Sequence, residues 1–237
     1  MKCIIPLAGP DFYRKEYGIK PLTKYNEDTL INFILNSRPW IYNKEILNED
    51  LIFILRDTNE SIIFEDYANK SYPGSKIVKI PEITQGALMT VLSGLSIIKD
   101  FEEPIIIDLV DIIYEIKNYK SIESMFLESN INAIIPYFKS NEDKFSYLII
   151  DDSNKVIKTK EKDVISDNAS AGTYIFRNLS TLLSAIDFSI KNKEEVMYNN
   201  LLFICPSVNG IIDQNSIVEP LKVKLVKSLS SFFHEWI

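Results

Sequence analysis

The sequence predicts an α/β fold with three layers (α/β/α), in which helices cover both faces of a mixed, mainly parallel central sheet. Short apolar, β-branched runs alternate with helical patterns from the start of the chain, as in Lys2–Pro6, Thr29–Asn36 and Leu51–Leu55. This alternation is typical of βαβ units. The strand-like runs are continuously apolar, which indicates strands buried on both faces. With 237 residues, 46% of them hydrophobic, we expect a single domain over residues 1–237.

The later elements follow from the same patterns. One pair of strands, Tyr147–Ile150 and Val156–Thr159, is separated by a polar stretch rich in turn formers and predicts an antiparallel hairpin, which makes the sheet mixed. Beyond Tyr198 the pattern is less regular, and strands are expected at Leu201–Cys205 and Val223–Leu225. The remaining strands are expected at Lys76–Ile80, Pro104–Ile107, Ile131–Tyr137 and Ala171–Phe176, and the remaining helices at Ser61–Tyr67, Gly86–Ile98, Lys120–Glu128 and Leu179–Asn192.

Composition excludes several classes of function. The net charge of −7 and the pI near 4.9 argue against a nucleic-acid-binding surface, which needs a concentrated basic patch. There is no uncharged apolar stretch of the length of a membrane span, and the first apolar run is broken by Pro6, so neither a span nor a signal peptide is expected. Cys3 and Cys205 lie in separate apolar runs and are expected to pack as small hydrophobes. The expected localisation is cytoplasmic.

The loop after the first strand is a candidate anion site. The strand ends in the small residues Ala8 and Gly9, which let a ligand approach the backbone N–H groups. Three basic residues follow within seven positions: Arg14, Lys15 and Lys20. Ligands bind at the carboxyl ends of strands in such sheets, so the loop is well placed. An ordinary strand–helix connection with solvated charges fits the spacing equally well.

This segment resembles the start of nucleotidyltransferases that activate sugar phosphates and related phosphate esters, a family with a Rossmann-like mixed sheet. The segments Leu7-Ala8-Gly9 and Lys20-Pro21-Leu22 match the two ends of the family's loop, although its second and third glycines are absent. The resemblance implies that Leu7, Ala8 and Gly9 bind the nucleotide. It also implies that Arg14 and Lys20 act as the catalytic cations that neutralise triphosphate oxygens.

Two further segments are candidates for the same nucleotide. Thr84-Gln85-Gly86-Ala87 is similar to the family's element that contacts base and ribose, which implies that Gln85 and Gly86 face the base. A simple helix start is the alternative for this segment. Arg56 ends the second apolar strand, from which it could reach the same cleft or pair with Asp57 or Glu60.

An apolar strand ending in carboxylates is the candidate metal site. Pro104–Ile107 is followed by Asp108 and Asp111. In the family a Gly-Asp pair stands here and its Asp binds Mg²⁺, so the resemblance assigns the cation to Asp111, with Val110 replacing the Gly. One good Asp suffices, because Mg²⁺ completes its shell with water and phosphate oxygens. Asp108 is expected to cap or pair structurally, and both residues could be mere turn formers.

The second half of the chain supplies candidates for the acceptor. Lys160–Asp163 is similar to the family's Glu-Lys-Pro element, which implies that Glu161 contacts the acceptor and Lys162 its phosphate. Asn168–Phe176 closely resembles the strand that floors the acceptor pocket, which implies roles for Asn168 and Gly172. Without the resemblance, the first segment is a solvated charge run and the second a strand with a close backbone approach.

The function that the resemblance implies is transfer of a nucleoside monophosphate from a nucleoside triphosphate, with Mg²⁺, to a sugar phosphate or related phosphate ester, with release of pyrophosphate. The expected role of this reaction is in surface polysaccharide synthesis. Such a reaction needs no general base, which suits a chain whose one histidine, His234, is expected to pack among aromatics. Base, acceptor and self-association stay open.

Two alternatives remain. The first is a nucleotide-sugar-dependent glycosyltransferase, although such enzymes space their two carboxylates by one residue and Asp108 and Asp111 are three apart. The second is a catalytically weakened nucleotide-binding or regulatory relative, which the missing loop glycines favour. The family's C-terminal metal carboxylate has only Glu235 as a weak candidate.

Overall fold

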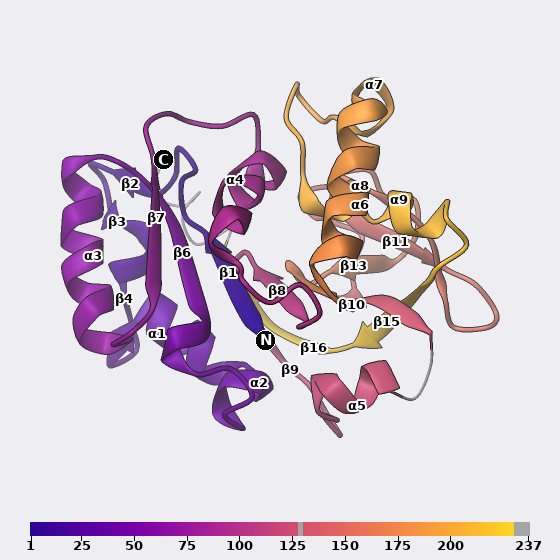
Figure 1. Cartoon of the computed structure of the whole chain (residues 1–237), viewed down its shortest axis with the longest axis horizontal. Coiled ribbons are helices and arrows are strands. Elements are labelled where there is room, and N and C mark those ends of the chain that lie inside the picture. Colours follow the sequence, from indigo (N-terminus) through magenta and orange to yellow (C-terminus); the bar gives the residue numbers. More distant parts are fainter. Residues whose placement is uncertain (128–129, 230–237) are drawn as a thin grey trace.

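A mixed ten-stranded sheet runs through the computed structural model, which describes residues 1–127 and 130–229 (Figure 1). The strands are β1 (Lys2–Pro6), β6 (Leu51–Arg56), β7 (Lys76–Ile80), β8 (Ile105–Asp108), β10 (Ile131–Lys139), β11 (Tyr147–Ile150), β12 (Val156–Lys160), β13 (Asn168–Ser170), β14 (Thr173–Phe176) and β15 (Ile217–Lys222). Their order is β12-β11-β13-β10-β14-β8-β1-β6-β7, and β15 also pairs with β10.

The first half of the sheet is parallel and the second mostly antiparallel. Strands β8, β1, β6 and β7 all pair in parallel. In the second half, β10 pairs in parallel only with β15, whereas the pairs of β14 with β8 and β10, and the hairpin of β11 and β12, are antiparallel. The predicted mixed α/β sheet is confirmed, and its parallel character is concentrated in the βαβ units of the first half.

Helices cover both faces of the sheet (Figure 1). In β1 the alternation places Cys3 and Ile5 in one core and Ile4 in the other. The first core includes helices α1 (Leu30–Ser37), α3 (Asn59–Ser71) and α5 (Ile122–Leu127), and the second includes α4 (Ala87–Gly94) and α6 (Leu179–Lys191). This is the three-layer arrangement that the sequence predicts. The helices are α1 (Leu30–Ser37), α2 (Pro39–Tyr42), α3 (Asn59–Ser71), α4 (Ala87–Gly94), α5 (Ile122–Leu127), α6 (Leu179–Lys191), α7 (Lys193–Val196), α8 (Ile204–Ser207) and α9 (Asn209–Ile212).

Within residues 1–127 and 130–229, three small antiparallel pairs lie outside the main sheet. They are β2 (Tyr13–Arg14) with β3 (Gly18–Ile19), β4 (Lys24–Tyr25) with β5 (Asp28–Thr29), and β9 (Ile112–Glu115) with β16 (Lys224–Ser228). The first two pairs fold the segment between β1 and α1 back on itself. This folding brings the chain from the loop after β1 to the capping residue of α1, Thr29, whose hydroxyl accepts a hydrogen bond from the backbone N–H of Asn32.

The structure differs from the predicted elements mainly after Tyr198. The predicted strand Leu201–Cys205 is wrong, because Ile204–Ser207 forms the short helix α8, with Pro206 in a first turn that tolerates proline. Strand β15 was not predicted, since Glu219 and Pro220 interrupt its apolar pattern. The predicted strand Ala171–Phe176 corresponds to β14, because Ala171 and Gly172 lie in the break between β13 and β14.

Other predictions concern packing and the membrane. Cys3 and Cys205 are both buried and form no disulfide, as predicted. Among the helices of residues 1–127 and 130–229, none combines the length and the hydrophobicity needed to cross a bilayer. His234 and Glu235 lie outside the described residues.

A buried ion pair ties α1 to β8. Arg38, at the end of α1, donates from Nε to Oδ2 of Asp108 at 2.6 Å and from Nη2 to Oδ1 at 3.1 Å. Both side chains are almost fully buried. Nη2 of Arg38 also donates to the backbone oxygen of Ile112 at 3.0 Å, and the guanidinium lies 4.0 Å from the ring centre of Tyr114. The expected pairing role of Asp108 therefore has a specific partner, 70 residues away in the chain.

Asp108→Ala is expected to lower the free energy of unfolding by about 3–5 kcal/mol, because it leaves a buried guanidinium without its counter-ion. Urea denaturation measures the loss. Asp187→Ala is the matched control, since Asp187 pairs with Lys191 on the exposed surface of α6 and such pairs contribute little. Equal effects of the two substitutions would contradict the structural role of the buried pair.

Candidate active site

A cavity of about 490 Å³ opens at the carboxyl ends of β1 and β8. The loop after β1, the 3-10 turn Lys20–Leu22, the start of α1, the segment before α4 and the turn after β8 form its walls. Leu201 and Phe203 close it from the second half of the chain. The predicted nucleotide residues Leu7, Ala8, Gly9 and Gly86 line this cavity. Ligands of α/β proteins bind in this position relative to the strands.

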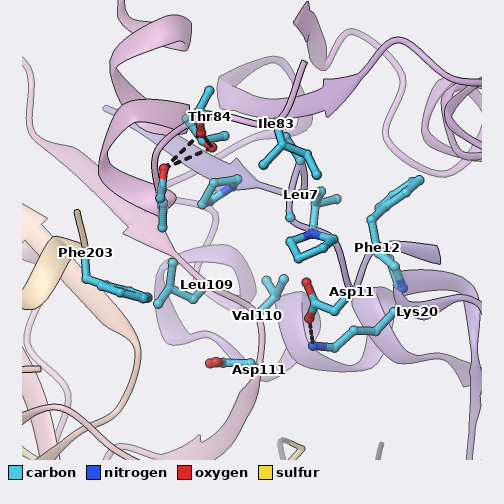
Figure 2. A pocket seen from close by; sticks show the side chains of 18 of the residues that line it. Leu7, Asp11, Phe12, Lys20, Ile83, Thr84, Leu109, Val110, Asp111 and Phe203 are labelled. Atoms are coloured by element: carbon cyan, nitrogen blue, oxygen red, sulfur yellow. Dashed lines mark hydrogen bonds and ion pairs between the residues drawn. The ribbon is translucent and has the colours of Figure 1, made fainter. Parts of the chain in front are cut away.

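The lining separates into an apolar part and a charged part (Figure 2). Leu7, Ile83, Leu109 and Phe203 are among the apolar walls. The charged side chains that line the cavity, among the described residues, are Asp11, Lys20 and Asp111. Such a division suits a ligand with a flat apolar group at one end and ionic groups at the other.

The turn after β8 that carries Asp111 is held from several sides. The backbone N–H of Val110 donates to Oδ1 of Asp108 at 2.9 Å, so the buried ion pair also shapes this turn. The backbone N–H of Leu109 donates to the backbone oxygen of Gly172 at 3.0 Å. Val110 has a φ of +48°, a conformation that is strained for a β-branched residue. The glycine that the resembled family has at this position suits the backbone geometry found here.

The Asp111 carboxylate is an unsatisfied buried acceptor. Its Oδ1 is buried and has no hydrogen-bond partner among the described residues. The pKa of Asp111 is raised from 3.8 to about 6, mainly by burial; Lys20 opposes the rise, and the charges of Asp108 and Asp11 contribute to it. Asp111 also lines the cavity, and a carboxylate with an oxygen that lacks a partner among the described residues fits the ligand preference of Mg²⁺.

Gly172 packs against this carboxylate. Gly172 has a φ of +72°, and a Cβ atom placed there would lie 2.8 Å from Oδ1 of Asp111. A side chain at this position is therefore disfavoured twice, by its backbone conformation and by the contact. The predicted acceptor residue Gly172 thus lies next to the predicted metal ligand, at the break between β13 and β14.

Gly86 allows the far wall of the cavity to close. A Cβ atom on Gly86 would lie 2.2 Å from the backbone oxygen of Leu202. The backbone of Leu202 donates to the oxygen of Gln85 at 3.0 Å and accepts from the N–H of Leu88 at 3.1 Å. The glycine is thus required by a close approach of two backbones, and this approach places Leu201 and Phe203 on the cavity wall.

Glu161 and Lys162 line a second cavity of about 450 Å³. Oε2 of Glu161 accepts a hydrogen bond from Oγ of Ser146 at 2.5 Å, and burial raises the pKa of Glu161 to about 7. The ammonium of Lys162 lies 5.4 Å from the ring centre of Tyr198 and 5.9 Å from that of Phe203. Phe203 lines the first cavity, so Lys162, which lines the second, also lies near a wall of the first.

Besides Glu161, Lys162 and Gly172, four predicted site residues do not line the first cavity, judged from the described part of the chain. Arg14 lies exposed in β2, and Arg56 ends β6. Gln85 contributes its backbone oxygen to the contact with Leu202. The Asn168 side chain is used within the fold, where its amide oxygen accepts from Lys139 and its nitrogen donates to the backbone oxygen of Leu148.

Sequence reasoning missed three features of the site. Asp11 pairs with Lys20, with 2.5 Å between its Oδ2 and Nζ of Lys20, and its position two residues after Gly9 was the available signal. Leu201 and Phe203 were assigned to a strand instead of a cavity wall. Arg38 gave no local signal, because its partner Asp108 is distant in sequence.

No family model matches this chain, and no curated protein sequence does. The fold, however, matches solved structures. The nucleoside-diphosphate-sugar pyrophosphorylase from Vibrio cholerae RC9 has a TM-score of 0.79 at 20% sequence identity, with 100% of this chain and 99% of that chain covered. This chain has the same fold.

Two further structures agree. The inositol-1-phosphate CTP transferase from T. maritima has a TM-score of 0.69 at 12% identity, covering 99% of this chain and 94% of that one. The UDP-glucose pyrophosphorylase complexed with UDP-glucose has a TM-score of 0.68 at 15% identity, covering 99% and 98%. The nucleotidyltransferase-like fold that the motifs predicted is therefore confirmed, and the likeness extends over nearly the whole chain.

Asp111→Asn is expected to raise the free energy of unfolding of the metal-free protein at pH 7 by on the order of 1–2 kcal/mol. The folded protein holds the ionised Asp111 less favourably than the unfolded chain does, and the neutral amide removes this cost. The difference should shrink as the pH falls below about 6, because Asp111 becomes protonated first in the folded state and, below its ordinary pKa of 3.8, in the unfolded chain as well. Urea denaturation at pH 7 and pH 4.5 tests this, and a less stable variant at pH 7 would contradict it.

Proposed function

We propose that this protein is a nucleotidyltransferase that moves a nucleoside monophosphate from a nucleoside triphosphate to a sugar phosphate or related phosphate ester, releasing pyrophosphate. The observation that carries the proposal is the first cavity. It combines apolar walls with Lys20 and the unsatisfied carboxylate of Asp111, at the carboxyl ends of β1 and β8. The likeness in fold to proteins named as pyrophosphorylases and a CTP transferase supports the same reaction class.

The nucleotide would lie along the first cavity. The base would pack between apolar residues such as Leu7 and Leu109, with Gly86 on the wall of the same cavity. The backbone of Ala8 and Gly9 would hold phosphate oxygens, and Lys20 would neutralise their charge. Asp111 would hold Mg²⁺, which when bound supplies positive charge next to the triphosphate.

The acceptor would approach from the side of the second cavity. Lys162 lines the second cavity and lies near Phe203 of the first, where its ammonium would attract the acceptor phosphate. Glu161, with a pKa of about 7, would donate a hydrogen bond to a neutral group of the acceptor when protonated and accept one from it when ionised. The attacking phosphate is already anionic near neutral pH, since its second pKa is about 6. The chain's task is therefore to position the two substrates and neutralise charge.

The alternatives differ in what they require. A glycosyltransferase with two metal carboxylates would need Asp108 beside Asp111, but Arg38 takes both oxygens of Asp108. A catalytically weakened relative would bind the triphosphate without turnover. The surface polysaccharide role stays a prediction of the family resemblance.

Release of pyrophosphate tests the proposal directly. The purified protein is incubated with MgCl₂, each common nucleoside triphosphate in turn, and a panel of sugar phosphates, phosphocholine and other phosphate esters. We expect pyrophosphate to appear with at least one pair, and to be lost when Lys20→Met is used. Triphosphate binding without turnover, across the whole panel, would favour the weakened relative.

Gly172→Ala is expected to weaken the Mg²⁺-dependent thermal stabilisation by a nucleoside triphosphate, because a Cβ atom there would displace Oδ1 of Asp111. Gly18→Ala is the matched control. Gly18 has a similar φ of +74°, but a Cβ atom on it meets nothing within 4 Å. Both substitutions should cost about 1–2 kcal/mol of stability through backbone strain. If both variants keep the full ligand-dependent shift, the assignment of the cation to Asp111 is wrong.

A further inference from the structure

The charged end of the first cavity carries more negative than positive charge. Its charged lining, within the described residues, consists of the carboxylates of Asp11 and Asp111 and the ammonium of Lys20. A triphosphate carries several negative charges at neutral pH. Without a compensating cation, this end of the cavity therefore repels the group that the proposed function requires it to bind.

Asp11 adds the second negative charge to this end of the cavity. Its carboxylate lies next to Lys20 and the loop at Ala8 and Gly9, the groups proposed to hold the phosphates. Oδ2 of Asp11 is 2.5 Å from Nζ of Lys20, the cation expected to meet the phosphates. Oδ1 lies 2.8 Å from the position of a Cβ atom on Gly9, so the carboxylate is folded against that loop (Figure 2). Burial alone would raise the pKa of Asp11, but Lys20 holds it below its ordinary value, so the carboxylate is ionised at neutral pH.

The Asp11–Lys20 pair therefore competes with a phosphate for the same ammonium. The contact is short and charge-assisted, and Lys20 is only 19% exposed while Asp11 is 53% exposed. The half-exposed partner is the one that can turn toward solvent or toward a cation. Once a divalent cation compensates Asp11, the ammonium of Lys20 is available to phosphate oxygens.

We propose that Asp11 makes triphosphate binding conditional on a divalent cation, by holding Lys20 and repelling phosphates when no cation is present. The inference rests on the proposed function only in taking a triphosphate as the ligand of this cavity. It assigns to Asp11 a specificity role: selection of the cation-complexed triphosphate over the free polyanion.

Isothermal titration with inorganic tripolyphosphate and with a nucleoside triphosphate, each in EDTA and in saturating MgCl₂, measures this selectivity. The wild type should bind much more weakly in EDTA. Asp11→Asn removes one charge with little change in shape, and it should tighten binding in EDTA by on the order of tenfold, so that the ratio of the two affinities falls. Asp11→Ser should act in the same direction, which guards against an effect peculiar to Asn.

Asp187→Asn is the control for net charge, because Asp187 pairs with Lys191 on α6 and does not line the cavity. It should leave both affinities unchanged. An unchanged ratio for the Asp11 variants would overturn the proposal. So would a loss confined to MgCl₂, which would make Asp11 only a cation ligand. Failure of every variant, wild type included, to bind either anion in MgCl₂ would overturn the proposed function itself.

Discussion

The buried ion pair between Arg38 and Asp108 is the interaction on which the site depends. It joins the end of α1 to the end of β8 and satisfies both oxygens of Asp108. Oδ1 of Asp108 also accepts a hydrogen bond from the backbone N–H of Val110, and Nη2 of Arg38 also donates to the backbone oxygen of Ile112. The pair therefore brackets Asp111 on both sides in sequence and fixes its turn. A rigid turn would suit the proposed role of Asp111 as a metal ligand.

The site contains two features that lower the stability of the folded protein. Val110 is held with a positive φ, and a buried oxygen of Asp111 has no hydrogen-bond partner among the residues that the structure describes. Each of these features is unfavourable by itself, and each persists because the surrounding hydrogen bonds determine the turn. Bound cation would relieve the unsatisfied oxygen. The clustering of strain and unsatisfied charge at one cavity is itself a reason to regard it as the functional site.

The sequence predicted the parts of this arrangement that depend on local pattern. The apolar run before Gly9 and the run before Asp108 both proved to be neighbouring parallel strands, so their ends meet at one cavity. Gly86 and Gly172 were singled out, and both turned out to be required by close approaches. What could not be predicted depends on long-range packing. Arg38 meets Asp108, and Leu202 meets Gly86, through contacts that leave no periodic signal in the chain.

We propose that the first cavity binds both the triphosphate and its cation, with Asp111 as the residue that ligates the cation. A crystal structure of the complex with Mn²⁺ and a non-hydrolysable nucleoside triphosphate tests it most directly, because the anomalous scattering of Mn²⁺ locates the cation. We expect an anomalous peak in contact with a carboxylate oxygen of Asp111, and phosphate oxygens near Lys20 and the Ala8–Gly9 backbone. A nucleotide bound elsewhere, or an anomalous peak away from Asp111, would contradict the account.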